Sequence, residues 1–135
     1  MHEGHDGSEP LPAAVERIGR AVIDAAFTVH RALGPGLLQS VYETCLAEEL
    51  RRLRLKAERQ VGVPVAYGDV RLDAGFRLDL LVEKVVVVEV KSIDALASIH
   101  TAQILTYLRL SGVRLGYLIN FNSVLLRNGL RRFVR

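Results

Sequence analysis

A run of five valines around one glutamate, residues 85–90, constrains the fold of this chain more than any other segment. A strand that is apolar on both faces has to be covered on both faces, so the run predicts a buried central strand. Helices packed on a sheet provide such a cover. We therefore expect a single α/β domain with a central mixed β-sheet flanked by helices.

Three segments show the spacing of apolar residues that is typical of amphipathic helices. The first covers residues 13–33 and ends at Gly34-Pro35-Gly36, and the second covers about 38–54. The third covers about 95–110, and Gly112 closes it, since glycine is the usual residue after a helix end. These helices are the expected cover of the sheet.

Further strands are indicated before and after the valine run. Pro64 lies within the first of them and favours an edge position or an irregularity, because proline cannot donate a hydrogen bond to a neighbouring strand. The pair Asn128-Gly129 between short apolar stretches predicts a tight hairpin near the C-terminus. The strand segments are residues 61–67, 70–82 and 115–121, with a turn at 68–69.

The 135 residues are enough for one hydrophobic core and too few for two ordinary domains. We expect a flexible N-terminal lead-in over residues 1–10 and one domain over residues 11–135. No segment has the roughly 20 apolar residues that cross a bilayer, and residues 1–10 lack a secretion signal, so a cytoplasmic location is expected. The single cysteine, Cys45, excludes an internal disulfide and is interpreted as a small buried apolar residue.

The formal net charge is +3, and basic residues concentrate in residues 51–56, 109–114 and 127–135. A polyanionic partner is compatible with this excess. The segment 51–56 has a simpler interpretation as the solvated face of a helix. Charge alone does not decide the function.

The chemistry centres on the end of the valine-rich strand. Side chains alternate along a strand, so Glu89 and Lys91 lie on one face while Val90 points to the other. A charge within such a strand is costly unless it is paired or bound to a metal ion. One interpretation is a simple ion pair of Glu89 with Lys91 in a purely structural protein.

Asp79 is the candidate partner on the preceding strand. It lies opposite Glu89 only if the connecting loop has three residues, Glu83-Lys84-Val85, or an equivalent bulge. A two-residue loop sets Val88 opposite Asp79 instead. The sequence leaves both loops open.

Two converging carboxylates, Asp79 and Glu89, together with the carbonyl oxygen of Val90 form a set of oxygen ligands that suits Mg²⁺ or Mn²⁺. Lys91 is then the residue expected to orient or deprotonate an attacking water or to stabilise charge on a phosphate. The reaction that fits this set of residues is phosphodiester hydrolysis.

These residues resemble the PD-(D/E)XK nuclease superfamily, in which an Asp on one strand and a D/E-x-K on the next build the metal site. The segment 76–79 (Phe-Arg-Leu-Asp) followed by 88–91 (Val-Glu-Val-Lys) carries the resemblance. Through residues 34–43 the chain is similar to the small GxxExxR family within that superfamily. The resemblance covers nearly all of the chain after Pro12 and implies a restriction-endonuclease-like core with nucleic acid as substrate.

The resemblance also implies a role for Gln103 and Tyr107, which match a Gln-x-x-x-Tyr pattern found on the helix after the lysine in some of these nucleases. Without the resemblance, both residues are interpreted as ordinary helix residues. Residues four apart lie on one face of a helix, so both can reach the same site. His100, one turn earlier, is interpreted as structural.

One position departs from the family pattern. Gln39 stands where the family name has a glutamate, and Tyr42 stands at its arginine. Gln39 and Glu43 are expected to border the pocket, and Glu43 can partly replace the missing charge. The expectation is a Mg²⁺- or Mn²⁺-dependent nuclease, and the alternative is a catalytically impaired module that binds nucleic acid or a protein. A homodimer or a partner protein could complete its binding surface.

Overall fold

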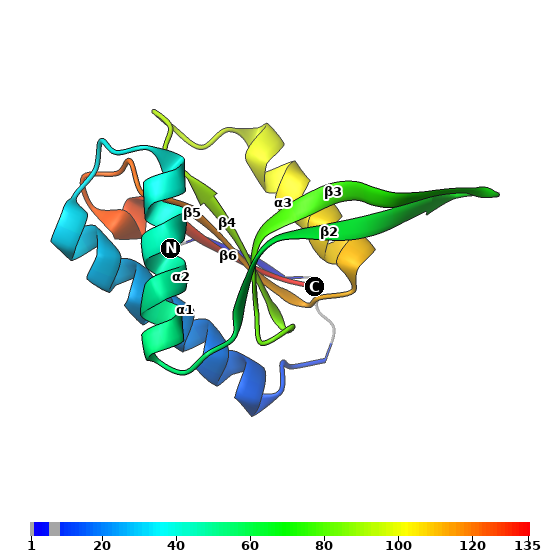
Figure 1. Cartoon of the computed structure of the whole chain (residues 1–135), viewed down its shortest axis with the longest axis horizontal. Helices are drawn as coiled ribbons and strands as arrows, with labels where there is room; N and C mark the ends of the chain where they lie inside the picture. The colour runs from blue at the N-terminus through cyan, green and yellow to red at the C-terminus, as the bar shows by residue number, and fades with distance from the viewer. Residues whose placement is uncertain (1, 6–8) are drawn as a thin grey trace.

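The computed structural model in Figure 1 describes residues 2–5 and 9–135. These residues form one six-stranded mixed sheet with three α-helices. In chain order the elements are β1 (His2–His5), α1 (Ala13–Leu33), α2 (Gln39–Arg52), β2 (Ala57–Tyr67), β3 (Val70–Val82), β4 (Val86–Lys91), α3 (Ser98–Ser111), β5 (Leu115–Asn120), the 3₁₀ turn η1 (Leu126–Gly129) and β6 (Leu130–Val134). The strand order is β1-β6-β5-β4-β3-β2, so the expected α/β fold is confirmed.

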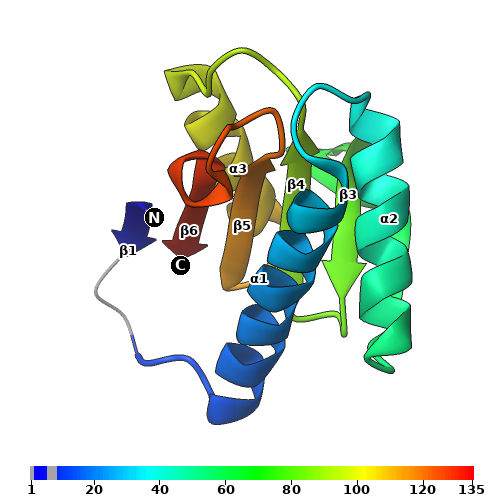
Figure 2. The same cartoon turned by 90° about the vertical axis from the view of Figure 1, so that its left-hand side faces the viewer.

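Helices cover both faces of the sheet, with α1 and α2 on one face and α3 on the other (Figure 2). Val88 belongs to the core beneath α1 and α2, whereas its neighbour Val87 belongs to the core beneath α3. All residues of β4 except Lys91 are buried. The valine run is therefore the central strand that the sequence predicts, because each face of it removes apolar area from water.

The β3–β4 connection decides which residues lie opposite each other. Val82 pairs with Val86, so the loop consists of residues 83–85, and Glu83 and Lys84 have the positive φ values of 50° and 60°. The amide of Val85 donates to the carbonyl of Val82 at 3.0 Å and closes the loop. The three-residue loop that brings Asp79 opposite Glu89 is thus confirmed.

Strands β2 and β3 form a long hairpin whose outer part extends beyond the helices (Figure 1). Gly68 and Asp69 make its turn, as predicted. β2 is the edge strand of the sheet, and the register shifts between Val63 and Val65, at Pro64. Both consequences expected of this proline are present.

The prediction of a tight hairpin at Asn128-Gly129 is wrong. These residues end η1, in which the amide of Asn128 donates to the carbonyl of Leu125. β5 and β6 are antiparallel neighbours, but the connection between them runs from residue 121 to 129. Gly129 is needed for close packing, since a Cβ there would overlap the hydroxyl of Ser123 and the carbonyl of Asn120.

The predicted flexible lead-in over residues 1–10 contains strand β1, which pairs in parallel with β6. Met1 and residues 6–8 lie outside the described residues. This pairing uses the backbone groups on the open edge of β6. The side-chain pattern of the first residues therefore does not predict strand β1. Within the described part of the chain, none of the helices combines the length and apolarity of a membrane span.

Candidate active site

The carboxylates of Asp79 on β3 and Glu89 on β4 each accept a hydrogen bond from a backbone amide of the opposite strand. The amide of Asp79 donates to Oε2 of Glu89, and the amide of Val90 donates to Oδ2 of Asp79, both at 2.9 Å. Regular pairing of the two strands spans Leu80 to Val82 on β3, so the carboxylates begin where the ladder ends. Each carboxylate takes the place of a carbonyl from the opposite strand, and this fixes both side chains.

Burial makes these two carboxyl groups hard to ionise. Glu89 is 4% exposed, and its burial, followed by the charge of Asp79, raises the pKa of Glu89 to about 8. Burial also raises the pKa of Asp79, and the amide of Val90 partly offsets this rise. Two like charges side by side in a poorly solvated place favour either a proton or a cation between them.

Lys91 lies close to both carboxylates without an ion pair to either. Its charge lowers the pKa of Asp79 and of Glu89, but the ion pairs of the described residues do not include one within 4.0 Å of Lys91. Lys91 is half-buried, and its ammonium group is therefore available for another contact. This geometry does not support the structural interpretation in which Glu89 and Lys91 are simply paired.

The segment after Lys91 is held by Asn120, which is paired with Lys91 across β4 and β5. The buried amide of Asn120 accepts from the amide of Ile93 at 3.1 Å and donates to the carbonyl of Ile93 at 3.0 Å. This two-way contact fixes the chain immediately after the lysine. Sequence reasoning missed Asn120, and a polar residue at the end of an apolar strand was the available signal.

Glu43 brings a third carboxylate to the site from α2. It is 5% exposed and binds Arg59 at 2.9 Å and the amide of Gln60 at 2.9 Å. Its charge contributes to the raised pKa of both Asp79 and Glu89. The expected position of Glu43 at the border of the site agrees with this geometry.

Gln60 links Glu43 to Asp79 and was not foreseen. Its side chain donates to Glu43, and its hydrogen bond to Asp79 lowers the pKa of that carboxyl group. Gln60 has a φ of 52°, and it interrupts β2 between the pairs Arg59–Leu80 and Val61–Leu78. A left-handed residue other than glycine in a strand is strained, which fits a residue held by its side-chain contacts.

The helix α3 contributes Gln103 and Tyr107 from the other face of the sheet. The ring of Tyr107 stacks on Phe76 with centroids 4.4 Å apart. Burial, then the charges of Glu89 and Asp79, raise the pKa of Tyr107, and a hydrogen bond from Gln103 opposes the rise. Tyr107 is therefore close enough to interact electrostatically with both carboxylates.

Three other polar residues considered in the sequence have clear positions. Gln39 is exposed at the first position of α2. His100 accepts a hydrogen bond from the amide of Ala97 at 2.9 Å and so caps α3, as its structural interpretation requires. The hydroxyl of Tyr42 donates to the carbonyl of Gly34 at 2.6 Å, which makes Tyr42 a support of the glycine-rich loop.

The donor set fits a divalent cation. Asp79 and Glu89 offer hard oxygen atoms, and a cation between them would remove the cost of keeping both ionised. The described residues contain no cluster of three His, Cys, Asp or Glu side chains in metal-binding arrangement. A cation here would therefore complete its shell with a backbone carbonyl, for which Val90 is the candidate, and with water.

Most of the chain matches one known protein family. Residues 16–133 match the PD-(D/E)XK nuclease superfamily. The chain belongs to this superfamily. Membership suggests a nuclease with nucleic acid as substrate, and nucleases of the superfamily generally use divalent metal ions. Neither the curated proteins nor the solved structures gave a match.

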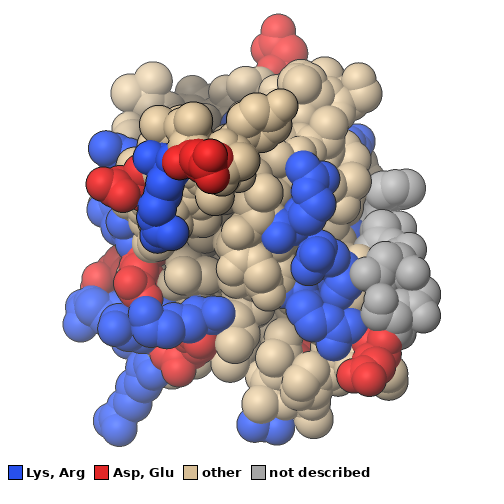
Figure 3. Space-filling model, turned by 90° about the vertical axis from the view of Figure 1, so that its right-hand side faces the viewer, with Lys and Arg blue, Asp and Glu red and all other residues tan. Residues whose placement is uncertain are grey.

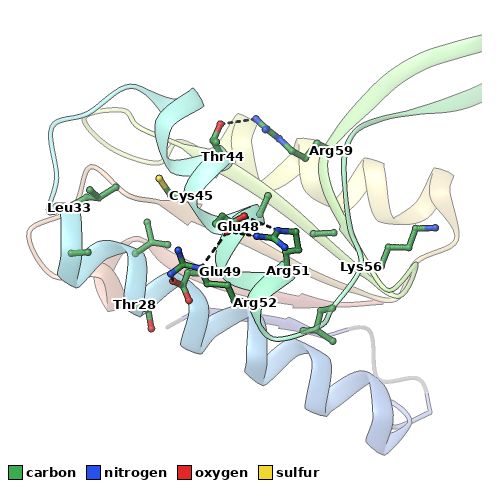
Figure 4. A pocket seen from close by; sticks show the side chains of 15 residues that line it. Thr28, Leu33, Thr44, Cys45, Glu48, Glu49, Arg51, Arg52, Lys56 and Arg59 are labelled. Atoms are coloured by element: carbon green, nitrogen blue, oxygen red, sulfur yellow. Dashed lines mark hydrogen bonds and ion pairs between the residues drawn. The ribbon is translucent and has the colours of Figure 1, made fainter.

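A separate groove of this PD-(D/E)XK domain, about 780 Å³ in volume, lies between α1 and α2 (Figure 4). Asp79, Glu89 and Lys91 do not line it. At its rim Glu48 is paired with Arg51 at 2.6 Å, so these charges are already satisfied. Cys45 lines the groove and is half-buried rather than fully buried. The groove is therefore distinct from the candidate active site.

The basic residues of the PD-(D/E)XK domain do not form one continuous field on the face drawn in Figure 3. Blue basic and red acidic side chains are interspersed with tan residues of other types on the described part of this face. Arg51 and Arg52 pair with acidic residues of α2, which agrees with the solvated-face interpretation of residues 51–56. Membership of the superfamily, rather than the surface charge, therefore suggests nucleic acid as the substrate.

Proposed function

We propose that this chain is a metal-dependent nuclease of the GxxExxR branch that hydrolyses phosphodiester bonds with Mg²⁺ or Mn²⁺. The observation that carries the proposal is the pair Asp79 and Glu89, fixed opposite each other beside an ammonium group without an ion pair. A structural ion pair needs one carboxylate and one cation, whereas this site gathers two carboxylates and leaves Lys91 unused. Such an arrangement supports catalysis better than it supports stability.

In this proposal Asp79, Glu89 and the carbonyl of Val90 hold the cation. When bound, the cation supplies polarisation of the scissile phosphate and a lowered pKa of a bound water. Lys91 orients or deprotonates the attacking water, or donates to the phosphate oxygen on which charge develops. Asn120 keeps the backbone after Lys91 in place, which limits the movement of its ammonium group.

The supporting residues act from both sides of the sheet. Tyr107 and Gln103 position the substrate or Lys91 from α3, since the tyrosine lies within the field of both carboxylates. Glu43 adds negative charge from α2 and compensates in part for the neutral Gln39. Gln60 acts on both carboxyl groups, since its side-chain amide donates to Glu43 and lowers the pKa of Asp79.

The alternative is a catalytically impaired module that keeps the fold and binds nucleic acid or a protein. The observation that favours it is Gln39, which is exposed and brings no charge to the position of the family glutamate. The buried Glu43 one turn later weighs against it, because a third carboxylate is still present at the site.

Cleavage of single- and double-stranded DNA and RNA in Mg²⁺ or Mn²⁺ tests the proposal. We expect the wild type to cut at least one substrate and Lys91→Ala to cut it at least about 100-fold more slowly. Lys56→Ala, at an exposed lysine outside the site, is the matched control and should retain activity. Equal background from the wild type and Lys91→Ala, with binding retained, would instead support the binding module.

A further inference from the structure

The outer part of the β2–β3 hairpin, residues 64–75, is called the arm here, and its strand edges are open. β4 pairs with β3 only at Leu80 to Val82, so among the described residues the arm's part of β3 has a neighbouring strand on one side only. β2 is the last strand of the sheet. The arm is thus a two-stranded ribbon that projects beyond the helices (Figure 1). Open strand edges are templates for pairing with another chain.

One face of the arm is apolar and exposed. Tyr67 pairs with Val70, and Val65 pairs with Leu72, so alternation puts these four side chains on one face. Tyr67, Val70 and Leu72 are 84%, 58% and 56% exposed. Large apolar side chains gathered at the end of a projecting ribbon favour contact with a protein partner.

The charge of the arm argues against nucleic acid as that partner. The arm carries Arg71 against Asp69 and Asp73, so it is slightly acidic. Surfaces that bind a phosphate backbone are basic, because each phosphate contact needs a cation. The arm is therefore better suited to a protein surface of complementary charge.

The charges of the arm are complementary to those of a second copy of the arm. A two-fold axis through Leu72 sets Arg71 of one copy opposite Asp73 of the other, and the reverse pair forms on the far side of the axis. Moving the axis by one residue, to Arg71, shifts the register by two residues and sets Arg71 opposite Arg71, which like charges disfavour. Moving the axis to Val70 draws the turn residues Gly68 and Asp69 into the strand pairing.

The hydrogen-bonding pattern agrees with the same register. Tyr67 and Val70 flank a two-residue turn, so they form the hydrogen-bonded pair that closes it. The pattern alternates along an antiparallel ribbon, which directs the backbone groups of Arg71 and Asp73 to the open edge. These are the residues that the two-fold register sets opposite each other.

From these observations we propose that two copies of this chain pair through the outer edge of β3, antiparallel about Leu72, into a four-stranded sheet made of two arms. The apolar faces join across the axis, and the two Arg71–Asp73 pairs fix the register. The interface lies on the arm, away from Asp79, Glu89 and Lys91, and it does not depend on the proposed nuclease activity.

Charge exchange tests the interface, with the dimer dissociation constant of the full chain measured by sedimentation equilibrium. Arg71→Asp and Asp73→Arg each set like charges opposite each other, and each should raise the constant by at least about tenfold. The double variant restores opposite charges and should return the constant to within about threefold of the wild type. Arg20→Asp, at an exposed residue of α1, is the charge-matched control and should leave it unchanged.

Cross-linking provides a second measurement. In a Cys45→Ala background, oxidation of Leu72→Cys should give a disulfide-linked dimer faster than oxidation of Val70→Cys, because only residue 72 meets itself at the axis. A chain that stays monomeric across the concentration series overturns the proposal. A dimer that the single charge variants do not weaken, or equal cross-linking at both positions, overturns it as well. A monomer that still cleaves nucleic acid contradicts only the interface and leaves the nuclease proposal in place.

Discussion

Asp79 and Glu89 each accept a hydrogen bond from the backbone of the other's strand, one from the amide of Asp79 and one from that of Val90. The two carboxylates therefore hold β3 and β4 together at the point where regular pairing stops. The same contact places two acidic groups side by side in a buried position. Stability and ionisation at this site are consequently linked, and this link can be measured.

Without metal, the unfolding free energy should fall as pH rises. The pKa of Glu89 is about 8 in the folded chain, well above its ordinary value of 4.5, so the folded state holds a proton that the unfolded state releases. Stability is then full below about pH 4.5 and declines up to about pH 8. We expect a total loss of roughly 2 to 4 kcal/mol by urea unfolding in EDTA.

Glu89→Gln should remove most of this decline, because the amide oxygen can still accept from Asp79 and carries no charge. The raised pKa of Asp79 leaves a smaller slope at lower pH. Added Mg²⁺ should raise the melting temperature of the wild type at pH 8 but not that of the variant. A pH-independent wild type would show that these carboxyl groups ionise normally.

Tyr107→Phe should separate the hydroxyl of Tyr107 from its ring. The ring keeps its stacking on Phe76, so stability should change by less than about 1 kcal/mol, while cleavage falls by about tenfold or more. Tyr107→Ala should lose both and destabilise by about 2 to 4 kcal/mol. The measurements are thermal melts and cleavage rates of both variants, and unchanged cleavage by Tyr107→Phe would remove the hydroxyl from the mechanism.

Gln39→Glu should strengthen cation binding. Residue 39 lies one helical turn before Glu43 and so on the same side of α2, which faces the site. Ser40→Glu is the matched control, because it adds the same charge to the same first turn but about 100° around the helix. Titrations of Mg²⁺ should show a severalfold lower dissociation constant for Gln39→Glu alone. Equal effects of the two substitutions would indicate a general charge effect.

Gln60→Gly and Gln60→Ala should differ in stability although both lose the bridging amide. The positive φ of Gln60 suits glycine, so the glycine variant should be more stable than the alanine variant by about 1 kcal/mol in urea unfolding. Both variants should bind Mg²⁺ differently from the wild type, since Glu43 and Asp79 lose the group between them. Equal stabilities would mean that the backbone at residue 60 relaxes.

Most of the fold follows from local patterns in the sequence. The valine run, the helical spacing of residues 13–33 and the position of Pro64 each correspond to the element that was expected. These predictions succeed because a buried strand or an amphipathic helix needs its pattern whatever surrounds it. Strand β1 and the turn at Asn128-Gly129 depend on backbone pairing and close packing with distant residues, which local patterns do not contain.

The site divides in the same way. The sequence alone identifies Asp79, Glu89 and Lys91 as candidate site residues, because a charged side chain in an apolar strand is costly unless it is paired or binds a metal ion. Asn120 offered only the weaker signal of a polar residue at the end of an apolar strand. Gln60 offered none, since its contacts depend on which side chains folding brings within reach of its amide. Glu43 lies between these cases, because its helix was predictable but its contact with Gln60 was not.

The hairpin of β3 and β4 bears on how related chains should be compared. Asp79 lies three residues before Val82 and Glu89 lies three residues after Val86, and these two valines are the pair that borders the loop. Because side chains alternate along a strand, loss or gain of one residue within either of these two intervals would turn one carboxylate away from the other without altering a motif residue. Equal spacing of the aspartate and the glutamate from the loop is therefore a stricter criterion for this kind of site than the identity of the motif residues.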